Sequence, residues 1–204
     1  MNKLVYIFKE AIPKKIRALK MHRKVKKLQN TNFSIISSNC IGGVVCKDFK
    51  QQQRSPTVNC FFYPKDFLNF LKRIPYYLAN DMKDATYNST YPIGKIDDIY
   101  IHFLHYNSFK EAKEKWDERK ERINFDNLFI IMTDRDGCTY DDMVVFDSLP
   151  YKNKILFSKN DYPELQSVIY IKHFKGPYYN SFKNIIGDRY YDSFDFLQWF
   201  NSGF

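Results

Sequence analysis

One uninterrupted apolar run constrains the fold of this chain most strongly. It covers residues 128–132 (Leu-Phe-Ile-Ile-Met) and ends at the polar sequence Thr-Asp-Arg-Asp-Gly-Cys of residues 133–138. Such a run is typical of a strand buried on both faces, because a strand with one solvated face alternates apolar and polar residues. Strands of that kind occur in parallel sheets that helices cover on both sides. The run therefore favours an α/β fold.

Other short apolar segments alternate with helical patterns along the rest of the chain. Further strands are expected at residues 33–37, 57–62, 93–96, 99–105, 154–158 and 167–171. Helices are expected at residues 44–49, 64–71, 76–80, 109–123, 140–149 and 193–200. This order predicts a single mixed, mostly parallel sheet flanked by helices, in a Rossmann-like three-layer arrangement. Because no repeat or composition break interrupts it, residues 31–204 are expected to form one domain.

The excess positive charge of the chain lies in one segment. The 204 residues include 32 Lys and Arg against 23 Asp and Glu, a formal net charge of +9. Residues 1–28 hold ten of those basic residues and one acidic residue, and the 22 basic and 22 acidic residues that follow cancel. A neutral body argues against a nucleic-acid groove, so no nucleic-acid partner is expected. Residues 1–30 are expected to form a basic helical arm, kinked at Pro13 or beginning there, that binds anionic lipid or packs as a solvated helix.

The cysteines and one short apolar segment bear on location. Cys40, Cys46, Cys60 and Cys138 form no CxxC pair and have no zinc-type spacing. The apolar residues 4–8 are too few for a signal-peptide core or a membrane span. Thiols of a protein that is not exported are normally reduced. A cytoplasmic protein is expected, peripheral on the inner face of the cell membrane if the basic arm binds lipid.

The first polar loop that leaves a predicted strand covers residues 37–43. In open α/β sheets, ligands bind beyond the carboxyl ends of the strands. Small residues let the backbone approach a ligand, and a helix N-terminus offers N–H donors. Ser38, Asn39, Gly42 and Gly43 are therefore candidates for a phosphate or oxyanion cradle, although the loop lacks the GxGxxG and P-loop sequences. The alternative is an ordinary turn from strand to helix.

Cys40 and two histidines are candidate catalytic groups. A cysteine at a helix N-terminus has a lowered pKa and can act as a nucleophile, whereas a buried one is a small apolar residue. His102 and His105 are three residues apart on a predicted strand, so they point to opposite faces and form no simple ligand pair. His105 lies nearer the carboxyl end of the strand and is the stronger candidate for a general acid or base. For His102, a hydrogen-bonded core position is the main alternative.

The second polar loop directly follows the buried strand. Asp134 and Asp136 have the Asp-x-Asp spacing with which many nucleotide-sugar glycosyltransferases hold a divalent cation, since hard cations prefer oxygen ligands. Without a metal, these carboxylates and Arg135 would orient a sugar or its donor, with Gly137 and Cys138 in the same binding loop. The alternative is a polar turn that Asp134 caps and in which Arg135 pairs with it.

Aromatic residues make up 18% of the chain and form one further candidate surface. Aromatic rings stack on sugars and bases alike. Near the carboxyl terminus, four tyrosines are interleaved with two cations: Tyr178, Tyr179, Lys183, Arg189, Tyr190 and Tyr191. An A/T-rich coding bias also raises the Phe and Tyr content, so this enrichment is a weak functional signal.

Several of these segments also resemble a known bacterial family. They are residues 32–43, 91–95, 101–106, 115–119 and 132–138. Over roughly residues 30–175, the sequence resembles a family of unknown function whose members are commonly named exopolysaccharide biosynthesis proteins because of where their genes lie. The resemblance implies an α/β fold and a role in building or decorating capsule or other surface glycans. It implies no established reaction and no catalytic residues.

These observations predict a transferase of surface-polysaccharide biosynthesis. In acyl transfer from acetyl-CoA to a sugar, His105 would be the base and Cys40 a nucleophile. In glycosyl transfer, Asp134 and Asp136 would instead hold a divalent cation and a nucleotide-sugar donor. The third reading is a non-catalytic glycan-assembly or sugar-binding protein. A carbohydrate or a lipid-linked glycan is the expected partner, and convergence of Cys40, His105 and the 134–138 loop on one cleft would favour catalysis.

Overall fold

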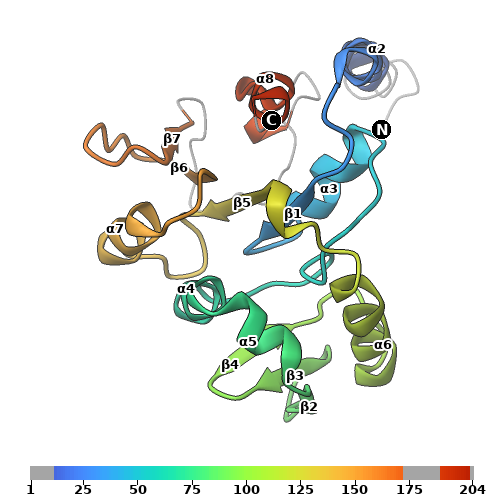
Figure 1. The fold of residues 1–204 in the computed structure, drawn as a ribbon, viewed down its shortest axis with the longest axis vertical. Helices are drawn as coiled ribbons and strands as arrows, with labels where there is room; N and C mark the ends of the chain where they lie inside the picture. Colours follow the sequence, from blue (N-terminus) through green and yellow to red (C-terminus); the bar gives the residue numbers. More distant parts are fainter. Residues whose placement is uncertain (1–11, 172–188, 203–204) are drawn as a thin grey trace, which may run out of the picture.

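A four-stranded parallel sheet forms the centre of the protein. The computed structural model describes residues 12–171 and 189–202. The sheet has the order β1-β5-β6-β7. These strands are Ser34–Ser37, Leu128–Thr133, Asn153–Ser158 and Val168–Tyr170. Helices lie on both sides of it (Figure 1), so the predicted α/β class and parallel sheet are confirmed.

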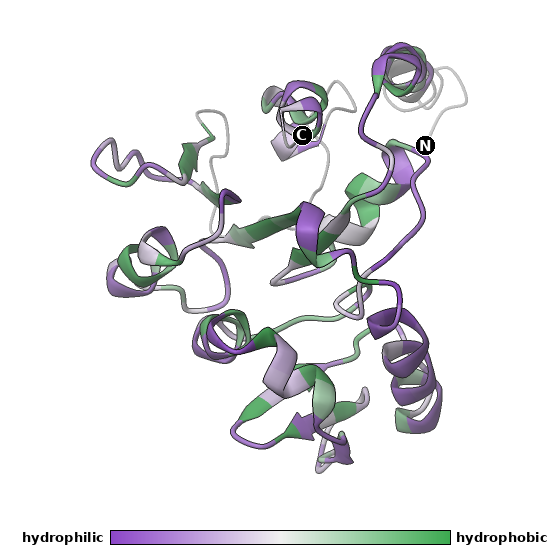
Figure 2. Cartoon of the chain, viewed as in Figure 1, coloured by the Kyte–Doolittle hydropathy of each residue, from purple (hydrophilic) through white to green (hydrophobic). Residues whose placement is uncertain are grey.

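Strand β5 is buried on both faces, as its apolar run predicts. Phe129 and Ile131 belong to one hydrophobic cluster and Ile130 and Met132 to the other, because successive side chains of a strand point to opposite faces. Helices α3 and α8 pack in the first cluster, and α4 and α7 in the second. Their bounds are Ile41–Asp48, Phe196–Asn201, Pro64–Lys72 and Tyr140–Ser148. In Figure 2 the strands at the centre are coloured as hydrophobic.

The two strands predicted at residues 93–96 and 99–105 form a hairpin in a second sheet. β3 (Ile93–Ile96) and β4 (Ile99–His102) pair antiparallel, and β2 (Lys83–Asp84) pairs with β3. The prediction placed the hairpin in the main sheet. Instead, Ile96, Ile99 and Ile101 of this small sheet pack in the same cluster as helix α4, so the hairpin covers that helix and does not extend the main sheet.

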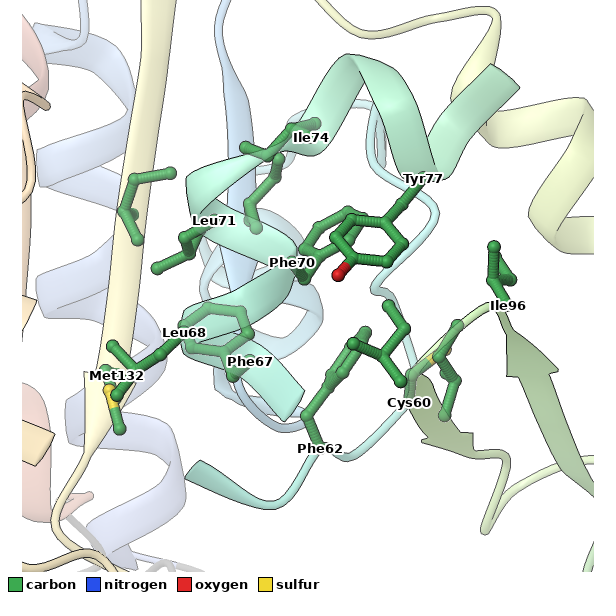
Figure 3. Close-up of a cluster of buried hydrophobic side chains, with 14 of the residues drawn as sticks. Cys60, Phe62, Phe67, Leu68, Phe70, Leu71, Ile74, Tyr77, Ile96 and Met132 are labelled. Atoms are coloured by element: carbon green, nitrogen blue, oxygen red, sulfur yellow. The ribbon is translucent and has the colours of Figure 1, made fainter. Parts of the chain in front are cut away.

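Helix α4 joins the two sheets in one hydrophobic core. Figure 3 shows its residues Phe67 and Leu68 on the side of Met132 of β5, and Ile96 of the small sheet beyond Phe70. Helices α5 (Ile74–Ala79) and α6 (Phe109–Lys120) complete this part of the core, α6 through Ala112 and Trp116. Two short 3₁₀ helices lie at Phe125–Asn127 and Tyr190–Ser193.

Residues 57–62 do not form the predicted strand. The Thr57 N–H donates to Ser55 Oγ (3.2 Å), the Cys60 N–H donates to the Thr57 carbonyl (3.3 Å), and Asn59 has a φ of 62°. Local hydroxyl and carbonyl partners thus fold this stretch into turns. Only Phe61 forms a β-bridge, antiparallel to His102. Strand β4 in turn ends at His102 and does not reach residue 105.

Helix α2 carries the described part of the basic arm. Among the described residues it covers Ile12–Lys27. Arg17 Nη2 lies 2.6 Å from Asp48 Oδ2, and Arg17 Nε lies 2.7 Å from Asp192 Oδ2. This half-buried ion-pair cluster fixes α2 to the body of the protein. Within residues 12–171 and 189–202, no helix has the length and apolar content to cross a membrane.

Candidate functional site

The two predicted loops leave the same edge of the parallel sheet. β1 and β5 are neighbours, with Ser37 in register with Ile131, so their carboxyl ends lie side by side. Asn39 connects the two ends, because its Nδ2 donates to Thr133 Oγ1 at 2.9 Å while its Oδ1 accepts from the Ile41 N–H at 3.1 Å. The edge is therefore held by a side chain of the first loop.

A pocket of about 220 Å³ opens beside Asn39. Its lining residues come from four separate stretches of the chain: Asn39, Cys40, Phe61, Leu104, His105, Arg135 and Asp136. The pocket thus brings together five residues that the sequence singles out, one thiol, one imidazole, one guanidinium, one carboxylate and one amide. Groups of these kinds can carry out nucleophilic and acid–base chemistry and bind an anion.

Cys40 is half-buried and directly precedes helix α3. Burial raises its pKa above the ordinary thiol value, and the nearby positive charge of Arg135 opposes that shift without reversing it. The expected lowering of the pKa by the helix N-terminus is therefore wrong, because removal of the thiolate from water outweighs it. Cys40 is a thiol at neutral pH, so a role as nucleophile requires a base.

The glycines of the first loop serve packing. A Cβ on Gly42 would lie 2.5 Å from Ser37 Oγ, so only glycine lets α3 approach β1 this closely. The Gly42 N–H donates to that same oxygen (3.2 Å), and Asn39 accepts from the Ile41 N–H. Gly43 is buried against Val58. In the predicted cradle, protein side chains therefore already accept from the Ile41 and Gly42 N–H groups.

Ser38 is likewise buried and bonded within the protein. Its N–H donates to the Ile131 carbonyl (3.0 Å), and its own carbonyl accepts from the Phe62 N–H (2.9 Å). Ser38 thus joins β1 to β5 and to the segment that carries Phe61. Both backbone groups through which Ser38 would bind a ligand are therefore already bonded within the protein.

The second loop is a tight turn that presents two side chains to the pocket. The Cys138 N–H donates to the Arg135 carbonyl (3.0 Å), and Asp136 and Gly137 have φ values of 59° and 85°. Two successive left-handed residues define a type I′ turn, for which Asp-Gly is a preferred sequence. Arg135 and Asp136 line the pocket, and burial raises the pKa of the Asp136 carboxyl while Arg135 lowers it. Gly137 serves the turn, because its φ of 85° favours glycine. It has no packing role, since a Cβ there would meet no atom within 4 Å.

Asp134 faces a different neighbour from Asp136. Its Oδ2 accepts from Ser158 Oγ (2.9 Å) and from the Lys159 N–H (2.8 Å), so it caps the end of β6. Asp134 does not line the pocket, and neither does Cys138, whose pKa burial raises to about 12. Within the described residues, no three His, Cys, Asp or Glu side chains are grouped so that they could hold a metal ion. The two carboxylates of the Asp-x-Asp sequence are therefore divided between two roles.

The two histidines differ in exposure. His105 is exposed at the pocket, where the sequence places its candidate acid or base. His102 is buried, and burial lowers its pKa, so it is neutral at physiological pH. Its backbone exchanges two hydrogen bonds with Phe61, at 2.8 and 2.9 Å. Its Nδ1 has no hydrogen-bond partner in residues 12–171 and 189–202. His102 is thus buried, but it is not the fully hydrogen-bonded core histidine that the alternative interpretation expects.

Three residues of the site have no motif that marks them. Phe61 and Leu104 line the pocket, and Tyr190 is buried where the charges of Arg135 and Asp134 act on its pKa, which burial raises. The Phe-Phe-Tyr sequence at 61–63 could have indicated an aromatic wall. Tyr190 belongs to the tyrosine-rich stretch, of which Tyr178, Tyr179 and Lys183 lie outside the described residues.

Comparison with known proteins places this site in a family. A family model described as a domain of unknown function (DUF1919) matches residues 11–201. The chain belongs to this family. It is also 42% identical to an uncharacterized protein of Haemophilus influenzae over 198 residues, which cover 95% of this chain and 96% of that protein. The DUF1919 match spans every residue that lines the pocket, so the candidate site lies inside the family's domain.

Proposed function

We propose that this protein is an acyltransferase, which moves a short acyl group from a thioester donor to a sugar hydroxyl during assembly of a bacterial surface glycan. The observation that carries the proposal is the meeting of Cys40 and His105 in one pocket with Arg135. A thiol exchanges readily with a thioester, and an imidazole accepts and returns protons near neutral pH. Acetyl-CoA is the donor that fits this chemistry. The surface-glycan setting follows from the sequence resemblance.

In the first half of the reaction, Cys40 takes the acyl group. His105 accepts the thiol proton as Cys40 Sγ attacks the donor carbonyl, and the bond between the carbonyl carbon and the donor sulfur breaks. The released donor thiolate takes the proton back from His105, so acyl-Cys40 and a free thiol result. A base is needed because burial keeps Cys40 protonated. Arg135 faces the same pocket, where its charge stabilises the oxyanion of the tetrahedral intermediate.

In the second half, the sugar accepts the acyl group. His105 removes the proton of the attacking hydroxyl, the new ester bond forms, and the bond from the carbonyl carbon to Cys40 Sγ breaks. The same proton then returns from His105 to the thiolate, which restores the resting enzyme. Asp136 is placed to accept a hydrogen bond from another hydroxyl of the sugar.

Glycosyl transfer from a nucleotide sugar has less support. That reaction would use Asp134 and Asp136 together on a divalent cation, whereas Asp134 is bonded to Ser158 and Lys159 and only Asp136 lines the pocket. Thermal unfolding separates the two donors, since a ligand that binds the native state raises the melting temperature. The melting temperature is expected to rise with acetyl-CoA. A rise with nucleotide sugars plus Mn²⁺, and none with acetyl-CoA, would favour glycosyl transfer.

Acetyl-CoA consumption tests the proposal. The enzyme is incubated with acetyl-CoA and a panel of free sugars, and the released CoA and the acetylated sugar are measured by chromatography. His105→Ala is expected to reduce turnover by about 100-fold or more, the usual effect of a lost general base. The matched control is His22→Ala, because His22 is exposed on α2. No turnover by the wild-type enzyme with any sugar, or equal turnover by His105→Ala, would contradict the proposal.

We propose further that helix α2 brings the enzyme to the anionic inner face of the cell membrane, where lipid-linked glycans are built. Its exposed side chains include Lys20, Arg23 and Lys26, together with Leu19, which is 64% exposed. Cations attract anionic lipid, and an exposed leucine adds apolar contact. This location accounts for the gathering of the chain's excess charge in one terminal segment.

Co-sedimentation with anionic vesicles tests this location. Charge reversal at Lys20, Arg23 and Lys26 to Glu is expected to abolish binding to vesicles that contain phosphatidylglycerol. The matched control reverses three exposed lysines elsewhere, Lys65, Lys110 and Lys152. Both variants keep Arg17, which holds α2 to the body. Equal binding by the two variants would show that α2 does not direct the enzyme to the membrane.

A further inference from the structure

A cluster of aromatic rings lies directly beside the pocket. Phe61, Tyr63, Tyr91 and His102 form it, and we call it the aromatic ledge. The ring centroids of Phe61, Tyr63 and His102 lie 4.9 to 5.1 Å apart in all three pairings, and Tyr91 lies 5.8 Å from His102. Tyr63 is 49% exposed. The ledge is therefore a packed set of rings that reaches the surface.

The backbone fixes the ledge to the pocket. Phe61 and Tyr63 alternate with the buried Phe62, so their rings share the side opposite to the core. The paired hydrogen bonds between Phe61 and His102 hold this segment against β4, the strand labelled at the edge of the small sheet in Figure 1. Phe61 is also part of the pocket wall. The ledge thus begins where the pocket ends.

His102 leaves one polar atom of the ledge unsatisfied. The residue is only 8% exposed, and its Nδ1 lacks a hydrogen-bond partner in residues 12–171 and 189–202. Buried polar groups nearly always have a partner in the protein, in water or in a ligand, so an orphaned one needs an explanation. Because burial keeps the imidazole neutral, its ring nitrogens include one donor and one acceptor. Nδ1 has almost no accessible surface, so a ligand hydroxyl reaches it only where a neighbouring ring of the ledge moves aside.

The chemistry of the ledge fits a sugar ring better than a nucleotide. None of the four side chains is Lys or Arg, and burial keeps His102 neutral, so the ledge offers no cation to a phosphate. The rings of Tyr63 and His102 stand at 88° and those of Tyr91 and His102 at 63°, so these pairs present no parallel faces between which a flat base could lie. A sugar presents C–H groups on one face and hydroxyls at its rim, which match an aromatic face and a polar nitrogen.

We infer that the aromatic ledge is the acceptor subsite of the pocket, and that it binds the sugar ring whose hydroxyl receives the acyl group. Tyr63 packs on the C–H face of that ring, and its shift on binding opens His102 Nδ1 to a second hydroxyl. This inference rests on the proposed acyl transfer for the direction in which the sugar reacts, whereas the binding itself is independent of Cys40. The ledge therefore sets which sugar and which hydroxyl are modified.

Saturation-transfer NMR with free monosaccharides tests the ledge. Glucose, galactose, mannose and N-acetylglucosamine are mixed singly with the full chain, and aromatic protein protons are irradiated. Transfer to sugar C–H protons is expected with at least one sugar for the wild type and for Cys40→Ser, which removes the chemistry but not the ledge. Tyr63→Ala is expected to abolish the transfer. The matched control is Tyr170→Ala, since Tyr170 is 42% exposed on β7 and outside the ledge.

His102→Phe separates the hydrogen bond from the ring. It keeps a buried aromatic group and removes Nδ1, so sugar affinity is expected to fall about tenfold, the loss of one neutral hydrogen bond. Native circular dichroism of both ledge variants shows that they fold. Unchanged sugar affinity in Tyr63→Ala and His102→Phe would overturn the inference, and so would the absence of transfer to every sugar with the wild type.

Two further outcomes distinguish failure of the ledge from failure of the acyl transfer. If transfer appears on the adenine protons of acetyl-CoA and is lost in Tyr63→Ala, the ledge binds the donor and the inference is wrong. If Cys40 is never acetylated but sugars still bind at the ledge, the acyl transfer is wrong and the sugar subsite stands.

Discussion

The loops that follow β1 and β5 leave the same sheet edge and have similar sequences of small and polar residues. Their roles differ, because most of the first loop bonds within the protein whereas the second presents side chains to the pocket. In the first, Ser37, Ser38 and Gly42 direct their polar groups into the protein. In the second, a type I′ turn holds Arg135 and Asp136 toward the pocket. Asn39 and Cys40 are the only side chains of the first loop that line the described pocket.

The contrast teaches how to interpret glycines at a strand end. A Cβ on Gly42 would meet Ser37 Oγ at 2.5 Å, whereas a Cβ on Gly137 would meet nothing but would be strained by a φ of 85°. The first glycine exists for helix packing and the second for the turn. Neither glycine is there to let the protein backbone approach a ligand closely, although the sequence alone favours that interpretation for glycines after a strand.

The sharpest test of this contrast replaces each glycine by alanine. Gly42→Ala is expected to lower the free energy of unfolding by about 2 kcal/mol, because overpacking against Ser37 exceeds the gain in helix propensity. Gly137→Ala is expected to cost about 1 kcal/mol, the strain of a left-handed residue. Urea unfolding measures both. A neutral or stabilised Gly42→Ala would show that α3 can move away from β1 without cost.

A second pair of substitutions compares the polar side chains of the loops. Asn39→Ala removes the bonds to Thr133 and to the Ile41 N–H, so a loss of about 1.5 kcal/mol is expected. Asp136→Asn keeps a residue that tolerates the left-handed conformation and should change stability by less than about 0.5 kcal/mol. The same urea experiment decides between them. Equal losses would mean that both loops are structural.

The pH dependence of alkylation tests how the loops act on each other. Because burial raises the pKa of Cys40, its reaction with iodoacetamide is expected to be slow at pH 7 and to accelerate only above the ordinary thiol pKa of about 8.5. Arg135 lowers that pKa, so Arg135→Gln should raise it and slow the reaction severalfold at pH 8.

Peptide mapping after alkylation assigns the label to Cys40, and Cys138, with a pKa of about 12, is the slow internal standard. Lys152→Gln, a change of the same charge at an exposed site, controls for the loss of one cation. Fast labelling of Cys40 at pH 7 would contradict the raised pKa. An unchanged rate in Arg135→Gln would show that the second loop does not act on the first.

The parts of the fold that local patterns determine could be predicted from the sequence. The apolar run of β5 gives a strand with two buried faces, and the Asp-Gly pair at 136–137 gives a turn at its end. Ser108 caps α6, since its Oγ accepts from the Glu111 N–H. Each of these features depends on residues within a few positions of one another, so periodicity and turn chemistry are sufficient.

The interior of the site could not be predicted, because it depends on contacts between distant segments. The Ser37 N–H donates to Thr57 Oγ1 (3.1 Å), which is twenty positions away in the sequence. This contact holds Thr57 in a turn, although its neighbours have the composition of a strand. The pairing of Phe61 with His102 creates the ledge, and Tyr190 reaches the Cys40 side of the sheet from the far end of the chain. No local sequence pattern encodes these contacts between distant segments.

Mass spectrometry of the intact protein with acetyl-CoA tests the central claim most directly, namely that Cys40 in the shared pocket carries the acyl group. In the absence of a sugar, the wild type is expected to gain the mass of one acetyl group, and peptide mapping should place it on Cys40. Cys138→Ser should gain the same mass, because Cys138 is half-buried but does not line the pocket. Cys40→Ser should gain none, and an added sugar should remove the label from the wild type. An unlabelled wild type, or a label that persists in Cys40→Ser, would contradict the account.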